Sequence, residues 1–215
     1  QTCSLPGQAG SDTAIAAQPN SFFPGTANAA AGATSLSLGA GTGVNRAIQP
    51  GDLLLIIQMQ GANFDATNTN GYGDGTVNSG VTNTVAFGVN GYAGGAAVPN
   101  FYAGTYEWAV AANSVPFAGG PLNLSAPLAN SYFNQAGGSG AAAFKRSFQV
   151  VRVPQYARAT VTADLTVQGW NGSTGGILAM DVAGDLTLTN RTINGNGRGF
   201  RGGGSVTGAP DTPTG

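Results

Sequence analysis

The sequence "GGILAMDVAGDLTLTNRTINGNGRGFRGGG" at residues 175–204 consists of short runs of alternating apolar and polar residues, separated by Gly, Asn and Asp. Alternation with a period of two is typical of strands that bury one face. Gly and Asn accept the left-handed backbone that sharp corners require. Short strands joined by such corners predict a β-solenoid, in which each coil stacks on the coil before it and the inward side chains form a ladder.

Earlier parts of the chain carry further strand signals. Apolar and polar residues alternate at residues 36–38, 122–124 and 161–167, as expected for half-buried strands. The run "LLLII" at residues 53–57 is apolar without interruption. Such a run predicts a strand that is buried on both faces.

Residues 148–153, "FQVVRV", place apolar residues on both faces of the expected strand. This change of phase predicts a β-bulge, and Pro154 is expected to end the strand. No segment repeats apolar residues at i, i+3, i+4 and i+7 over three helical turns. We therefore predict an all-β protein with a β-solenoid, or parallel β-helix-like stack, behind an irregular β region. The alternative is a β-sandwich, whose short strands recur at roughly 8–12-residue spacing.

The chain divides into three parts by composition. Residues 1–32 are small and polar and predict an extended N-terminal arm, residues 33–204 predict a single β domain, and residues 205–215 predict a flexible C-terminal tail. Within the domain, residues 61–100 are rich in Asn, Gly and Thr and are expected to form a long loop. Loops of this length are often functional or cover a core.

The composition favours an extracellular protein. Charged residues make up 8% of the chain, and 36 of its 215 residues are Gly, whereas an average soluble domain has about 25% charged residues. Its surface must therefore be solvated mainly by neutral hydrogen-bonding groups, which depend little on pH or salt. Because the chain begins at Gln1 rather than Met, we expect that a secretory signal peptide has been removed.

Charge and hydropathy exclude two classes of partner. The net charge is −1, so we predict no basic surface that would bind nucleic acid through its phosphates. No apolar run approaches the roughly 20 residues of a membrane span, so we predict no membrane insertion.

Few residues are suited to catalysis. The chain has no His and one cysteine, Cys3, which excludes Ser-His-Asp and Cys-His arrangements, ordinary zinc sites and an internal disulfide. Asp181 and Asp185 would share one face of a continuous strand and are the candidate carboxylate pair of a polysaccharide-cleaving enzyme, unless both lie at turns. Glu107, between Tyr106 and Trp108, is expected to point away from both into solvent. We predict that the protein is not an enzyme and has no catalytic residue.

A calcium site is the one cofactor site that the sequence suggests. The stretch "FDATNTNGYGDG" at residues 64–75 offers oxygen ligands from Asp65, Asn68, Asn70 and Asp74, and Ca²⁺ prefers oxygen ligands of these types. The spacing does not match the EF-hand loop. The alternative is a loop whose Asn and Asp side chains bond to its own backbone. Apart from calcium, no cofactor is predicted.

Four stretches carry a resemblance to a known group of proteins. They are "PGDLLLIIQMQGA" at 50–62, "GTYEWAV" at 104–110, "FQVVRVPQY" at 148–156, and "WNGSTGGILAMDVAGDLTL" with "GRGFRGGG" between 170 and 204. They resemble the N-terminal regions of very large secreted bacterial cell-surface proteins, and the last strands also resemble the β-helical repeats of filamentous-haemagglutinin-like adhesins. The resemblance covers most of residues 33–204. It implies a bacterial surface location and brings no catalytic residue.

Three functions follow from these features. The favoured hypothesis is a self-assembling structural protein: a subunit of a bacterial surface filament, surface layer or adhesin stalk. Copies of the chain would join by contacts between β-edges or by strand addition. The second hypothesis is an adhesin module that binds glycans through residues 61–102, with aromatic residues such as Tyr72 and Trp108. The least favoured is a polysaccharide-cleaving β-helix enzyme.

Overall fold

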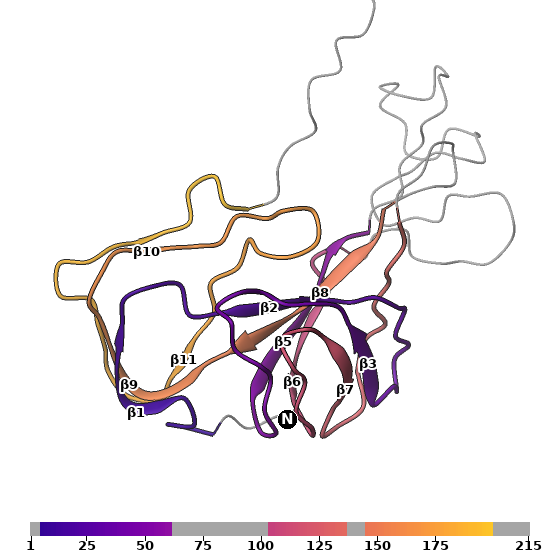
Figure 1. The fold of residues 1–215 in the computed structure, drawn as a ribbon, viewed down its shortest axis with the longest axis horizontal. Helices are drawn as coiled ribbons and strands as arrows, with labels where there is room; N and C mark the ends of the chain where they lie inside the picture. Colours follow the sequence, from indigo (N-terminus) through magenta and orange to yellow (C-terminus); the bar gives the residue numbers. More distant parts are fainter. Residues whose placement is uncertain (1–4, 62–102, 137–144, 200–215) are drawn as a thin grey trace, which may run out of the picture.

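A computed structural model describes residues 5–61, 103–136 and 145–199. In these ranges the chain is all-β, with thirteen strands in four sheets, no sheet closed into a barrel, and no helix, which confirms the predicted class (Figure 1). The strands are β1 (Gly10–Ile15), β2 (Ser21–Pro24), β3 (Ser35–Leu38), β4 (Thr42–Gly43), β5 (Leu53–Gln60), β6 (Tyr106–Val110), β7 (Gly120–Asn123), β8 (Ser147–Val153), β9 (Gln155–Val161), β10 (Leu165–Thr166), β11 (Asp181–Val182), β12 (Leu186–Thr187) and β13 (Ile193–Asn194).

The centre of the molecule is a five-stranded antiparallel sheet in the order β4-β2-β8-β5-β6. Of its three inner strands, β8 is wholly buried and β2 and β5 are mostly buried, because other parts of the chain cover both faces. One face forms a core that includes Phe23, Leu54, Ile56, Phe148 and Val150. The opposite face forms a core of Phe22, Leu53, Leu55, Val151 and Val153.

The first face packs against the two-stranded sheet of β3 and β7, in which Leu36 and Leu122 are register partners. Two sheets packed face to face form a sandwich-like arrangement in this part of the chain, consistent with the alternative prediction. Complete burial of one such Leu, Ile or Phe contributes about 1.5–3 kcal/mol to stability. The predicted alternation at residues 36–38 and 122–124 is confirmed, since Leu36, Leu38, Leu122 and Leu124 are all buried.

The second face packs against the C-terminal part of the chain. Ile177 and Ala179 lie on the core that contains Leu53 and Leu55. The sheet is therefore a middle layer, which explains why "LLLII" and "FQVVRV" are apolar on both faces. The strand predicted at 53–57 is confirmed as buried on both faces.

The bulge predicted within residues 148–153 is wrong. β8 pairs without a break with β2 from Gln149 to Arg152, and its apolar residues change phase because each face meets its own core. The register shift lies instead on β5, between Gln58 and Gln60, opposite the start of β8. Pro154 ends β8 as predicted, and the chain then enters a different sheet as β9.

The last third of the chain pairs in parallel. β9 has β1 on one side and β11 and β12 on the other, and β10 pairs with β13. Figure 1 shows these strands gathered at the left of the molecule, while the antiparallel sheets lie to the right. Every pairing in this region is parallel, whereas every pairing in the central sheet is antiparallel.

The segment expected as an N-terminal arm takes part in both regions. Residues 10–15 form β1 beside β9, and residues 21–24 form β2 beside β8. Phe22 and Phe23 of β2 are completely buried, one in each core. The predicted tail at 205–215 and nearly all of the predicted loop at 61–100 lie outside the described residues.

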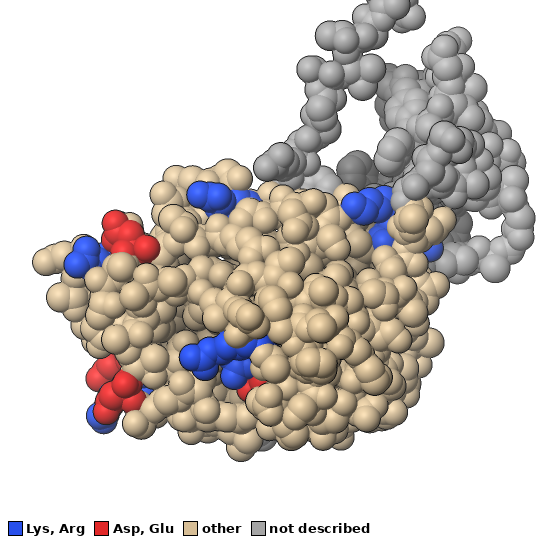
Figure 2. Space-filling model, in the orientation of Figure 1, with Lys and Arg blue, Asp and Glu red and all other residues tan. Residues whose placement is uncertain are grey.

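Charged groups are sparse on the surface. Figure 2 shows a mainly uncharged face with a few separate groups of charged side chains. Across the described ranges, the fold includes no helix that is long and apolar enough to cross a membrane.

Candidate functional site

The parallel ladder ends in an exposed apolar row. Leu186, Leu188 and Ile193 have 39%, 40% and 40% of their surface exposed. Their ladder partners one rung further in are Ala159 for Leu186 and Leu165 for Ile193, and both partners are buried. Ladder positions whose side chains are buried on β9 and β10 are therefore exposed on β12 and β13.

The backbone at this end has one open edge. In the part of the chain that the structure describes, β12 pairs only with β9, and β13 only with β10. An exposed edge presents N–H and C=O groups that can pair with another strand. Apolar side chains beside an open edge make this the candidate site for adding a further strand.

A left-handed corner holds the end strands in place. Thr189 and Asn190 have φ values of 21° and 56°, in the region that Asn adopts more readily than most residues. The N–H of Arg191 donates to the carbonyl of Leu188 at 2.6 Å, and the N–H of Thr192 donates to Oδ1 of Asp164 at 2.8 Å. The corner is thus tied to the rung beneath it.

Asp181 and Asp185 do not lie on one continuous strand. Asp181 begins β11, and the bend at Ala183 and Gly184 separates it from Asp185, which precedes β12. The carbonyl of Asp185 accepts the N–H of Ala159 at 3.0 Å. The shared face that a paired-carboxylate site needs is therefore not formed.

Glu107 has a structural contact that its sequence context did not indicate. Its carboxylate accepts the N–H of Ala129 at 2.8 Å and that of Asn130 at 3.0 Å. Glu107 is half-buried rather than fully solvated, and these backbone bonds hold its carboxylate. The prediction that Tyr106 and Trp108 share the other side of the strand is confirmed, since they are 58% and 45% exposed.

A groove of about 720 Å³ runs along β6. Its walls come from Trp108 and Glu107, from residues 124–129, and from Met180 and Asp181. Glu107 fixes one wall by its bonds to the backbone at 129–130. The groove therefore combines an exposed indole, two carboxylates and an apolar floor.

Behind this groove lies Tyr132, which is completely buried. Burial raises the pKa of its hydroxyl well above the usual range, and the nearby negative charge of Glu107 raises it further. The hydroxyl stays protonated and donates to the carbonyl of Ile56 at 3.4 Å.

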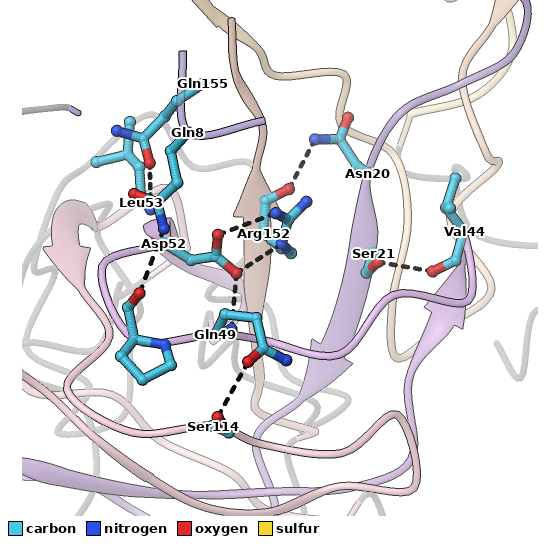
Figure 3. Close-up of polar contacts among 11 residues, drawn as sticks. Gln8, Asn20, Ser21, Val44, Gln49, Asp52, Leu53, Ser114, Arg152 and Gln155 are labelled. Atoms are coloured by element: carbon cyan, nitrogen blue, oxygen red, sulfur yellow. Dashed lines mark hydrogen bonds and ion pairs between the residues drawn. The ribbon is translucent and has the colours of Figure 1, made fainter. Parts of the chain in front are cut away.

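A buried ion pair joins the turn before β5 to the end of the neighbouring strand β8 (Figure 3). Arg152 donates from Nε to Oδ2 of Asp52 at 2.6 Å and from Nη2 to Oδ1 at 2.9 Å. Oδ2 of Asp52 also accepts the N–H of Gln49 at 2.8 Å, which closes the turn before β5. The residues Pro50, Gly51 and Asp52 are typical of a turn, but the charged partner of Asp52 lies 100 residues further on.

Asn20 connects three segments next to this pair. Its Nδ2 donates to the carbonyl of Arg152 at 3.0 Å and to that of Ala179 at 2.6 Å, and its Oδ1 accepts the N–H of Ala179 at 3.0 Å. The N-terminal segment, β8 and the segment before β11 are thereby fixed to one another.

The predicted calcium ligands Asp65, Asn68, Asn70 and Asp74 lie outside the described residues, so that site stays a prediction. Within the described ranges, no three Asp, Glu, His or Cys side chains gather where they could hold a metal ion.

Comparison with known proteins adds no evidence to these observations. No protein-family model, no curated protein and no solved structure matches the chain.

Proposed function

We propose that the protein is a self-assembling structural component of a bacterial cell surface: a subunit of an extracellular filament, surface layer or adhesin stalk. The observation that carries this proposal is the exposure of Leu186, Leu188 and Ile193 at the open end of a parallel ladder. Apolar side chains in a row beside unpaired backbone groups favour the addition of another strand. The resemblance to secreted bacterial surface proteins points to the same setting.

In this proposal, the C-terminal part of the chain is a β-solenoid stack. Gln155 pairs with Asp181, Ala159 with Leu186 and Leu165 with Ile193, at separations of 26, 27 and 28 residues. A nearly constant separation between parallel neighbours is what one coil per rung produces. Such a stack can be extended because each added coil buries the apolar row of the coil before it.

The occupant of the open end is a second copy of this chain. The parallel sheet has two edges, with β1 at one and β11 and β12 at the other. If β1 of one copy pairs with β12 of the next, all strands stay parallel and the sheet continues from one copy into the other. Contacts between two different surfaces do not have to close, and they then build a filament.

Light scattering over a range of concentrations tests this assembly. We expect the wild-type protein to associate beyond its 21.2 kDa monomer, and negative-stain micrographs to show rods. Leu186→Asn combined with Ile193→Asn should abolish association, because polar side chains gain nothing from burial. The matched control is Tyr106→Asn, which removes another exposed large side chain, 58% exposed, on β6 of the antiparallel sheet. Monomers at all concentrations, or unchanged association of the double variant, would contradict the proposal.

A second candidate function is glycan binding at the groove along β6. The support for it is the exposed indole of Trp108 beside the carboxylates of Glu107 and Asp181. A sugar ring can lay its C–H face on an indole while its hydroxyls bond to carboxylates. Titration with neutral oligosaccharides tests this function. We expect Trp108→Ala to abolish binding and Trp108→Phe to keep part of it. Equal binding by the wild type and both variants would reject the groove as the glycan-binding site.

A further inference from the structure

A second, smaller cavity of about 180 Å³ lies where the chain passes from β8 to β9. Residues 13–19 cover it from one side, and Val44 and Arg46 lie at another. Its remaining walls are Arg152, Pro154 and Tyr156. Three segments that are far apart in the sequence thus meet around one space.

The polar side chains that line this cavity are hydrogen-bond donors or can act as donors. They are Thr13, Gln18, Arg46, Arg152 and Tyr156, and none of the described lining residues is Asp or Glu. The guanidinium groups of Arg46 and Arg152 can only donate. A cavity with such a wall is complementary to a ligand that accepts hydrogen bonds.

Gln18, which also lines the cavity, has a side-chain amide that lacks a hydrogen-bond acceptor. Its Nε2 is buried and has no hydrogen-bond partner among the described residues. An unsatisfied buried N–H costs about 1–3 kcal/mol, so such groups in folded proteins call for a specific explanation.

The charge around the cavity is positive. Arg152 is engaged through Nε and Nη2 with Asp52, so that one carboxylate balances one guanidinium. Arg46 is exposed and adds a second positive charge at the rim. Burial raises the pKa of Tyr156, and Arg46 and Arg152 lower it in part, so both arginines act on a hydroxyl that remains a donor at neutral pH.

We propose that this cavity binds a small carboxylate, with Arg46 supplying the charge, Tyr156 donating from the wall, and Arg152 forming the base. The cavity is smaller than the roughly 300–1,000 Å³ of sites for drug-sized ligands, which limits the bound part to a carboxylate and its immediate neighbourhood. The planar fork of an arginine can bind a carboxylate through two parallel hydrogen bonds. The carboxylate can belong to a free acid or to an acidic sugar.

Calorimetric titration of the full chain with acetate, with D-glucuronate and with sulfate tests the site, with glucose as the uncharged control. We expect both carboxylates to bind and glucose not to bind. Tighter binding of glucuronate than of acetate assigns the ligand to acidic sugars, and equal binding assigns it to the carboxylate alone. Tighter binding of sulfate than of either carboxylate, or no binding of any anion, overturns the proposal.

Variants locate the binding in this cavity. Arg46→Gln removes an exposed charge that takes no part in the pair with Asp52, so the protein should fold, and we expect about tenfold weaker carboxylate binding. Tyr156→Phe removes a single donor and should weaken binding several-fold. The matched control is Arg158→Gln, which removes another exposed Arg of β9 that does not line the cavity. Equal loss of binding in Arg158→Gln and Arg46→Gln would show a general charge effect and refute the site.

Discussion

Leu165 and Ile193 are direct neighbours in the parallel ladder, yet Leu165 is completely buried and Ile193 is 40% exposed. The difference arises because Leu165 lies within the stack, whereas Ile193 lies on the last described rung. In the proposed solenoid stack, one coil cannot bury its own inward face and depends on the next coil. The end of this ladder is therefore the part of the fold that gains most from an added strand.

The pair of Asp52 and Arg152 is expected to be essential for stability. Asp52→Ala leaves a buried guanidinium without its carboxylate, and removal of one partner of a buried pair costs about 3–5 kcal/mol. Urea unfolding measures this loss. Asp12→Ala, at an exposed position of β1, is the control and should change the free energy of unfolding by less than about 0.5 kcal/mol. Equal effects of the two substitutions would mean that the ion pair contributes little.

Stability should fall when the pH rises above about 10, the ordinary pKa of a tyrosine. Burial raises the pKa values of Tyr132 and Tyr156 in the folded protein, so the unfolded chain releases these protons first. The free energy of unfolding is then fully retained below pH 10 and decreases as the pH approaches the folded-state pKa values.

The variant Tyr132→Phe tests the origin of this pH dependence. It keeps the buried ring but removes the hydroxyl, so its stability should decrease less steeply above pH 10 than that of the wild type. At neutral pH it should lose about 0.5–1.5 kcal/mol for one hydrogen bond. Urea midpoints across the alkaline range provide the measurement, and an identical slope in both proteins would exclude Tyr132 as the source.

Two glycines with the same backbone conformation should differ in their tolerance of a side chain. Gly119 and Gly32 have φ values of 90° and 87°. A Cβ at Gly119 would lie 2.5 Å from the backbone of Gly39, whereas a Cβ at Gly32 would meet nothing within 4 Å.

Gly32→Ala should therefore cost only the roughly 1–2 kcal/mol of a left-handed non-glycine residue. Gly119→Ala should cost at least about 1–3 kcal/mol more, because the backbone of Gly39 must move. Thermal unfolding of the two variants gives the comparison. If both lose the same stability, the close approach of the two backbones is not a constraint on the fold.

The local pattern of the sequence was sufficient to predict strands but not their partners. Alternation at Leu36 and Leu38 and the uninterrupted run at residues 53–57 indicated the burial that the structure has. The phase change at 148–153 was misread as a bulge because a strand between two layers has the same pattern. The pairing of β3 with β7, which forms the second sheet of the sandwich-like arrangement, joins segments more than 80 residues apart. No local pattern reveals such a partner.

The polar contacts were less predictable for the same reason. The turn at 50–52 was visible in "PGD", but its partner Arg152 comes from a distant strand. Glu107 alternates with two aromatic residues, which correctly gave its side of the strand. Its bonds to the backbone at 129–130 depend on a loop that the sequence places nowhere near it. The strand at 10–15 was missed because small polar residues carry little strand signal, and the strand at 21–24 was missed because its two adjacent Phe residues show no alternation.

Disulfide trapping tests the proposed head-to-tail contact most directly. Ala14 pairs with Thr160, and Thr160 pairs with Thr187. A sheet that continues into a second copy therefore brings Ala14 of that copy beside Thr187. Adjacent strands lie about 4.8 Å apart, within the range of a disulfide. Within one chain the two residues are separated by an intervening strand and are too far apart to be bridged.

The measurement is the size of the covalent products when Ala14→Cys and Thr187→Cys are combined in a Cys3→Ser background and the protein is oxidised at high concentration. We expect a ladder of disulfide-linked multimers on a non-reducing gel. We expect none when Ser11→Cys replaces Ala14→Cys, because that cysteine lies three residues out of register. Monomers alone, or equal multimers from both cysteine pairs, would contradict assembly through the end of the ladder.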